Sequence, residues 1–156
     1  MIRTKIVFGV LAFLLLFTGC SKKPGNPKNE ILIICDSSCN LAAAELAEAF
    51  KEKTGIDSAI TIATGPDILA LVKVGKKGDI LITDGSLLEQ ISSAGVLAAD
   101  AGVGFTSADK KPQDPQQVHK NVHVIGLNYS ENGMAVMQFV EFAREQGPEI
   151  FAKYAD

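Results

Sequence analysis

Two cysteines four residues apart, Cys35 and Cys39, could carry out thiol chemistry in this chain. They follow a short apolar run at 31–34 and precede a stretch whose apolar residues recur at helical spacing. A helix start carries N–H groups and a partial positive charge, which lower the pKa of a nearby thiol and favour the thiolate of Cys39. We therefore predict a reversible Cys35–Cys39 disulfide in an oxidising compartment; the alternative is two small buried thiols.

Hydroxyl residues beside predicted helix starts could instead bind an anion. Three such residues follow predicted strands: Ser38, Thr64 and Ser86. The N–H groups at a helix start can hold an anion without help from Lys or Arg. Helix capping is the alternative role. Capping is favoured for Ser86, which matches a capping box with Glu89, and is equally open for Ser38 and Thr64.

Other combinations of reactive side chains give weaker indications of a functional site. Four side chains of the types that bind Zn or Cu occur in the sequence: Cys35, Cys39, His119 and His123. Their spacing is loose and the two pairs are far apart in the sequence, so we expect no metal site. Asp36, Asp79 and Asp84 are expected in capping or solvated roles rather than as a catalytic pair. No P-loop, GxSxG or HExxH motif occurs, and we expect neither a cofactor nor an enzyme activity.

The elements that would position these residues alternate between strand and helix. The patterns predict strands at 31–34, 59–63, 79–83 and 122–127, and helices at 41–53, 68–74, 86–94, 133–145 and 149–154. A long loop is expected at 101–118, and Gly147-Pro148 is expected to break the last helix. Strands that alternate with helices at this spacing are typical of parallel βαβ units. The predicted fold class is α/β with a mostly parallel sheet, in which strands 31–34 and 79–83 are central and strand 122–127 returns to the same sheet.

The amino-terminal residues are typical of a targeting segment. Arg3 and Lys5 precede an apolar stretch at 6–17, which is too short to span a bilayer and fits a signal peptide. The stretch ends in the letters FTGC, which resemble the bacterial lipobox, with Phe in place of the usual Leu. The resemblance implies cleavage before Cys20, lipidation of Cys20 and attachment to the cell membrane or an outer membrane. An ordinary signal peptide is the alternative.

The chain therefore divides into a signal peptide at 1–19, a lipid-anchored tether at 20–29 and one α/β domain at 30–156. The tether contains Lys, Pro, Gly and Asn but no apolar residue, which suits a flexible link between a membrane and a domain. The formal net charge is −3 and there is no basic block, so nucleic acid is not an expected partner. We expect the domain to face the periplasm or the cell exterior.

Three segments of the sequence resemble a known family. They are SSCNLAAAELAEAFKEKTGI, TGPDILALVKVGKKGDILITDGSLLEQISSAGVL and VHVIGLNYSENGMAVMQFVEFAREQGPEIFAKYAD. They are similar to the first lobe of periplasmic molybdate-binding proteins, which are type II solute-binding proteins of ABC importers. The resemblance implies a single three-layer α/β lobe that binds a small oxyanion through Ser37, Ser38, Thr64 and Gly65. Ser38 matches the family's first ligand serine, and Gly65 stands where its second serine would be, with Thr64 beside it.

The family's second lobe has no counterpart here. Only residues 98–121 separate the third helix from the returning strand, which explains the expected loop as the stub of an absent lobe. A lone lobe cannot enclose its ligand, so an ABC permease or a second-lobe partner could complete the site. Cys35 and Cys39 are foreign to the family. Two alternatives stay open: an exported thiol/disulfide redox protein that uses these cysteines, and a degenerate lobe that acts as an interaction module.

Overall fold

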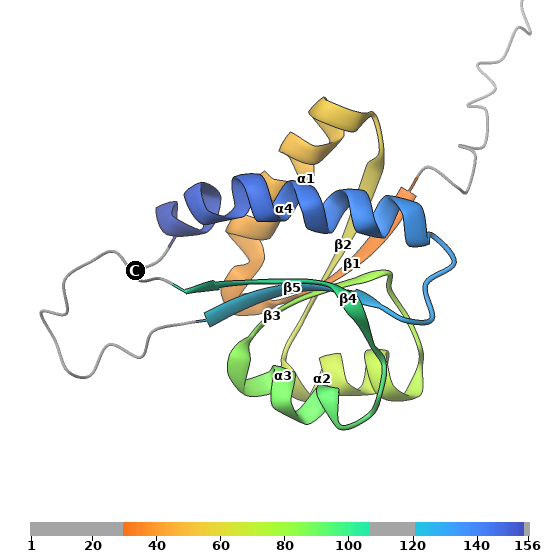
Figure 1. Ribbon diagram of the computed structural model, residues 1–156. Coiled ribbons are helices and arrows are strands. Elements are labelled where there is room, and N and C mark those ends of the chain that lie inside the picture. Colours follow the sequence, from red (N-terminus) through yellow and green to blue (C-terminus); the bar gives the residue numbers. More distant parts are fainter. Residues whose placement is uncertain (1–29, 107–120, 155–156) are drawn as a thin grey trace, which may run out of the picture.

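The computed structural model describes residues 30–106 and 121–154 of the chain. Within these residues, five strands form one sheet that has helices on both faces (Figure 1). The elements in chain order are β1 (Glu30–Asp36), η1 (Ser37–Cys39, a 3₁₀ turn), α1 (Asn40–Thr54), β2 (Asp57–Ala63), α2 (Gly65–Leu69), η2 (Ala70–Val74, a π-helical turn), β3 (Ile80–Asp84), α3 (Gly85–Ser92), β4 (Leu97–Thr106), β5 (Asn121–Leu127) and α4 (Gly133–Lys153).

The strand order across the sheet is β2-β1-β3-β5-β4. Strand β1 pairs in parallel with β2 and β3, and β5 pairs antiparallel with β3 and β4. The predicted α/β fold is confirmed, with parallel pairing at the core of the sheet, and so is the return of β5 to that sheet. Because β1, β2 and β3 run in one direction, they all begin at one end of the sheet, the amino end, and finish at the other, the carboxyl end.

Two apolar layers hold the helices on the sheet. Helices α1 and α4 cover one face, and α2 and α3 cover the other (Figure 1). On the first face, the fully buried rings of Phe50 and Phe139 meet edge to face with centroids 4.9 Å apart. The apolar residues of α2, η2 and α3 bury the other face; they are Ile68, Val72, Leu87 and Ile91. Each face of the sheet is therefore covered, as continuous apolar strands require.

Strand β4 forms where the sequence predicted the start of a loop at 101–118. It pairs antiparallel with β5, and Gly104 lies opposite His123. A Cβ atom at Gly104 would lie 2.9 Å from Nδ1 of His123, so the glycine leaves room for the imidazole ring. The loop prediction was wrong for this strand, because its glycines serve close packing rather than a turn. Residues 107–118 lie outside the described residues.

Helix α4 continues through Gly147 and Pro148, where the sequence predicted a break. A Cβ atom at Gly147 would collide with the ring of Phe105, so this ring packs directly on the helix backbone. Phe105 also stacks on Phe151 of the last turn, with centroids 5.3 Å apart. The predicted break was wrong because this packing holds the last turns, although Pro148 has no N–H to donate to the preceding turn.

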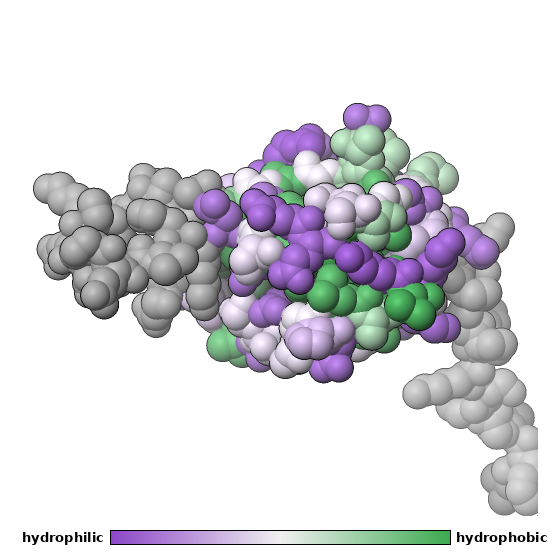
Figure 2. Space-filling view, turned by 90° about the horizontal axis from the view of Figure 1, so that it is seen from below, coloured by the Kyte–Doolittle hydropathy of each residue, from purple (hydrophilic) through white to green (hydrophobic). Residues whose placement is uncertain are grey.

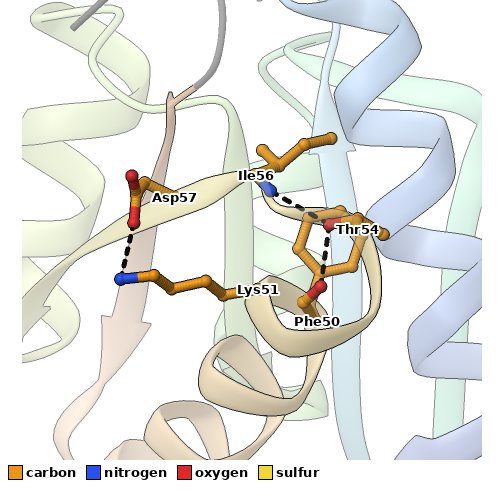
Figure 3. A network of polar contacts seen from close by, with 5 residues as sticks. All are labelled: Phe50, Lys51, Thr54, Ile56 and Asp57. Atoms are coloured by element: carbon orange, nitrogen blue, oxygen red, sulfur yellow. Dashed lines mark hydrogen bonds and ion pairs between the residues drawn. The ribbon is translucent and has the colours of Figure 1, made fainter.

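The turn from α1 into β2 is fixed by the side chain of Thr54 (Figure 3). Its hydroxyl donates to the carbonyl oxygen of Phe50 at 2.7 Å and accepts the N–H of Ile56 at 3.2 Å. An exposed ion pair between Lys51 and Asp57, 2.8 Å long, joins the same helix to the start of β2. These contacts set where β2 begins and thus its register against β1.

A carboxylate joins three elements at the amino end of the sheet. Oδ2 of Asp79 accepts the N–H of Leu32 in β1 at 2.8 Å and Nδ2 of Asn132 at 3.2 Å. Oδ1 of the same residue accepts the hydroxyl of Ser130 at 2.5 Å. Asn132 also donates to the carbonyl oxygen of Glu30 at 3.3 Å. Asp79, expected in a solvated or capping role, instead ties β1, the start of β3 and the turn before α4 together.

The predicted signal peptide at 1–19 and the tether at 20–29, including Cys20, lie outside the described residues. Among the residues that are described, none of the helices combines the length and the apolar character needed to cross a bilayer. The proposed lipid anchor therefore stays a prediction from the sequence.

Candidate functional site

The predicted ligand-binding residues meet at the carboxyl end of the sheet. In the parallel pair of β1 and β2, Asp36 lies opposite Ala63 at the last position of both strands. The residues that follow are consequently neighbours, and they are the ones named from the sequence: Ser37, Ser38, Thr64 and Gly65. Strand β3 ends on the other side of β1, which brings the start of α3 to the same end. Ligand binding by these residues stays a prediction.

Acidic side chains occupy two of the three helix starts. Oδ1 of Asp36 accepts the N–H of Ser38 at 2.8 Å. Oδ1 of Asp84 accepts the N–H groups of Ser86 and Leu87 at 3.0 and 3.1 Å, and the Ser86 hydroxyl at 2.6 Å. The N-cap of α3 is therefore Asp84 and not Ser86, so the predicted capping box was assigned to the wrong residue. The carboxylates of Asp36 and Asp84 therefore accept hydrogen bonds from N–H groups that the sequence analysis expected to bind an anion.

The hydroxyls of Thr64, Ser38 and Ser37 differ in the hydrogen bonds that they make within the domain. Thr64 donates its hydroxyl to Oδ2 of Asp67 at 2.9 Å and makes no side-chain cap of α2. Ser38 is exposed, and its Oγ lies 3.6 Å from Sγ of Cys39, a weak contact. Ser37 is exposed as well. The serines after β1 are consequently better placed to meet a solute than Thr64 is.

Among the described residues, the charged side chains at the helix starts of this end are acidic. Three carboxylates, those of Asp36, Asp67 and Asp84, stand at the starts of η1, α2 and α3. Their field lowers the affinity for an anion and favours groups that donate hydrogen bonds. The expected capping role of Asp36 and Asp84 is confirmed, and an Asp directly after an apolar strand is a common N-cap signal. The competition of these caps with an anion for the same N–H groups was not foreseen from the sequence.

Both cysteines near this site are buried thiols that are not joined by a disulfide in the structure. Sγ of Cys35 donates to the carbonyl oxygen of Asp36 at 3.2 Å. Burial, followed by the nearby Cys39 and Asp36, raises the pKa of the Cys35 thiol to about 12. At neutral pH Cys35 is therefore protonated, and a protonated thiol is a poor nucleophile. This state disfavours the redox alternative, and the disulfide itself stays a prediction.

The four possible metal ligands named from the sequence also include two histidines, His119 and His123. His119 lies outside the described residues. Within the described parts of the chain, no group of three or more His, Cys, Asp or Glu side chains is arranged to hold a metal ion. His123 lies instead on β5, where its imidazole packs against Gly104 and faces the first residue of α3.

Thr83, next to Asp84 at the end of β3, is a feature that the sequence did not reveal. It is fully buried, and its hydroxyl has no hydrogen-bond partner among the residues that the structure describes. It lies opposite His123 in the antiparallel pair of β3 and β5. A buried hydroxyl without a partner costs about 1–3 kcal/mol, so this strand end is less stable than an apolar residue would make it.

Comparisons with known proteins support the fold. No family model and no curated protein sequence matches this chain. A solved structure described as the substrate binding domain of a molybdenum ABC transporter from Clostridium difficile is similar, with a TM-score of 0.65 and 11% sequence identity. The match covers 81% of this chain and 97% of that chain. The chain therefore shares the fold of that solved domain over nearly the whole length of the solved chain.

Proposed function

We propose that this chain is a solute-binding domain, held outside the cytoplasm by lipid on Cys20, that recognises a small oxyanion at the carboxyl end of its sheet. The observation that carries the proposal is the meeting of Ser37, Ser38 and Thr64 at neighbouring ends of parallel strands. Ligands of open α/β sheets bind at this end. The similarity in fold to a transporter's substrate-binding domain supports the same function class.

The acidic residues at this end determine which groups would remain available to contact a ligand. Because Asp36 and Asp84 already hold helix N–H groups, the hydroxyls of Ser37 and Ser38 would supply the main contacts to the ligand. A single open lobe leaves much of a bound solute in water, so we expect weak binding. An ABC permease or a partner with a second lobe would cover the ligand and strengthen binding. Molybdate is one oxyanion of the proposed class.

Substitutions of Ser38 and Asp36 should change oxyanion affinity in opposite directions. Ser38→Ala removes one hydroxyl donor and should weaken binding by about 0.5–1.5 kcal/mol, or roughly two- to tenfold. Asp36→Asn keeps a residue that can cap a helix but removes a negative charge, and should tighten binding by on the order of 1 kcal/mol. Titration calorimetry of the mature chain with molybdate, tungstate, sulfate and phosphate measures both effects.

The matched control is Ser92→Ala, an exposed hydroxyl at the far end of α3, which should leave the affinity unchanged. Equal affinities for the parent and Ser38→Ala would show that Ser38 only belongs to the helix start. If an ammonium compound binds instead, and binds more weakly to Asp36→Asn, the ligand class is a cation and the oxyanion proposal is wrong.

The lipid anchor is tested separately from the ligand. Cys20→Ser should move the protein from the membrane fraction to the soluble fraction, because the side chain that carries the lipid is removed. Mass spectrometry of the parent should find an acylated Cys20 as the first residue. Ser21→Ala is the control and should stay in the membrane fraction. An unmodified parent chain that begins elsewhere would remove the anchor from the proposal.

A further inference from the structure

Of the large apolar side chains that the structure describes, the two most exposed lie at the amino end of the sheet. Val74 is 84% exposed and Met134 is 80% exposed. Val74 ends η2, directly before the chain enters β3, and Met134 lies in the first turn of α4. Figure 2 shows the face of α2 and α3, where hydrophobic residues (green) lie beside hydrophilic ones (purple). Both side chains therefore stand in solvent at the amino end of the domain, where burial against an apolar surface would be favourable.

Three lysines surround Val74 in the sequence VKVGKKGD: Lys73, Lys76 and Lys77. The turn that carries them is fixed by hydrogen bonds. The N–H of Gly75 donates to the carbonyl oxygen of Ala70 at 2.9 Å, and that of Lys77 to the carbonyl oxygen of Leu71 at 3.0 Å. The hydroxyl of Tyr129 donates to the carbonyl oxygen of Lys77 at 2.8 Å. The turn therefore presents one apolar side chain among three positive charges on an ordered backbone.

This lysine turn (residues 73–77) lies at the same end of the domain as the point where the amino-terminal segment joins it. Asp79, two residues after the turn, accepts from Asn132, and Asn132 also donates to the carbonyl oxygen of Glu30. Figure 1 shows the end of η2, the start of α4 and the start of β1 on one side of the molecule. The ten Cα–Cα steps from Cys20 to Glu30 reach at most about 35 Å.

We infer that the amino end of the domain is a membrane-facing surface, in which the lysine turn binds anionic phospholipid headgroups while Val74 enters the interface. The inference rests on the proposed lipid anchor, which would keep this end within reach of the bilayer. Lysines near an anionic surface attract it strongly, and an apolar side chain among them gains from burial at the headgroup boundary. The solute site at the carboxyl end would then face away from the membrane, toward a partner with a second lobe rather than toward a permease in the same membrane.

The test uses the full lipidated chain in vesicles of phosphatidylethanolamine and phosphatidylglycerol. Val74→Cys, labelled with an environment-sensitive fluorophore, should emit at shorter wavelength in these vesicles than in neutral phosphatidylcholine vesicles. Labelled Ala152→Cys, at an exposed position near the opposite end of the domain, is the matched control and should not shift. Adding Lys73→Gln, Lys76→Gln and Lys77→Gln to Val74→Cys should abolish the shift, and high salt should do the same.

Flotation of the same vesicles separates this inference from the anchor. Protein that floats with both kinds of vesicle but shows no anionic-specific shift at residue 74 retains its anchor and overturns the membrane-facing surface. Equal shifts at residues 74 and 152 also overturn it, because the domain would then have no preferred orientation. Protein that does not float at all overturns both the anchor and the inference that rests on it.

Discussion

Replacing Phe139 with alanine is expected to lower the free energy of unfolding by about 3–5 kcal/mol. The ring is fully buried between α4 and the sheet, and it meets the ring of Phe50 edge to face. Removing it leaves a cavity in the layer that joins the first helix to the last, and neighbouring side chains can fill such a cavity only in part. Urea denaturation of the protein, followed by circular dichroism because the chain has no tryptophan, measures the change.

The matched control is Met137→Ala on the same helix. Met137 is 65% exposed, so its replacement should change the free energy of unfolding by no more than about 0.5 kcal/mol. A loss below about 1 kcal/mol for Phe139→Ala would mean that α4 does not pack on α1 as described. Removing a fully buried aromatic ring lowers the free energy of unfolding by more than that.

The second large effect is expected for Asp79→Ala, at about 3 kcal/mol of lost stability. The substitution leaves the N–H of Leu32, the hydroxyl of Ser130 and the amide of Asn132 without their acceptor at the amino end of the sheet. Hydrogen bonds to a charged acceptor are stronger than neutral ones, and these three join separate elements. The same denaturation measurement applies.

Asp100→Ala serves as the control for the loss of a carboxylate, because Asp100 is exposed on β4. Its unfolding free energy should match that of the parent within about 0.5 kcal/mol. Asp79→Asn should fall between the parent and Asp79→Ala, since an amide oxygen can still accept one of the three bonds. If Asp79→Ala is as stable as Asp100→Ala, the carboxylate is dispensable and water satisfies its partners.

The sequence was sufficient for the parallel half of the fold. Strand 31–34 is a continuous apolar run, strand 79–83 contains another at 80–82, and each is followed by a helix that ends near a glycine. Such local signals agree with one another, and the structure places β1 and β3 as predicted. They were less informative where a residue's role depends on a partner distant in sequence. Gly104 resembled a loop residue because nothing nearby reveals that His123 would lie across it.

The helix break predicted at Gly147-Pro148 was wrong for the same reason. These residues are a strong local stop signal, yet the contact that keeps the helix intact comes from Phe105, which belongs to another strand. At the candidate site, the position of Ser38 followed from strand direction alone. The partners of the helix starts did not, because Asp84 and Ser86 both suit an N-cap, and only the end of β3 decides between them.

The packing of α1 against α4 also has a consequence for how the chain acquires its structure. Phe50 and Lys153 belong to the opposite ends of the domain's sequence, yet Phe50 needs Phe139, and Lys153 pairs with Glu45 of the first helix. Until the residues of α4 are available, α1 alone covers that face of the sheet and the ring of Phe50 has no partner from α4. Contacts between residues so distant in sequence are costly to close, so we expect the docking of α4 to be a late step in folding.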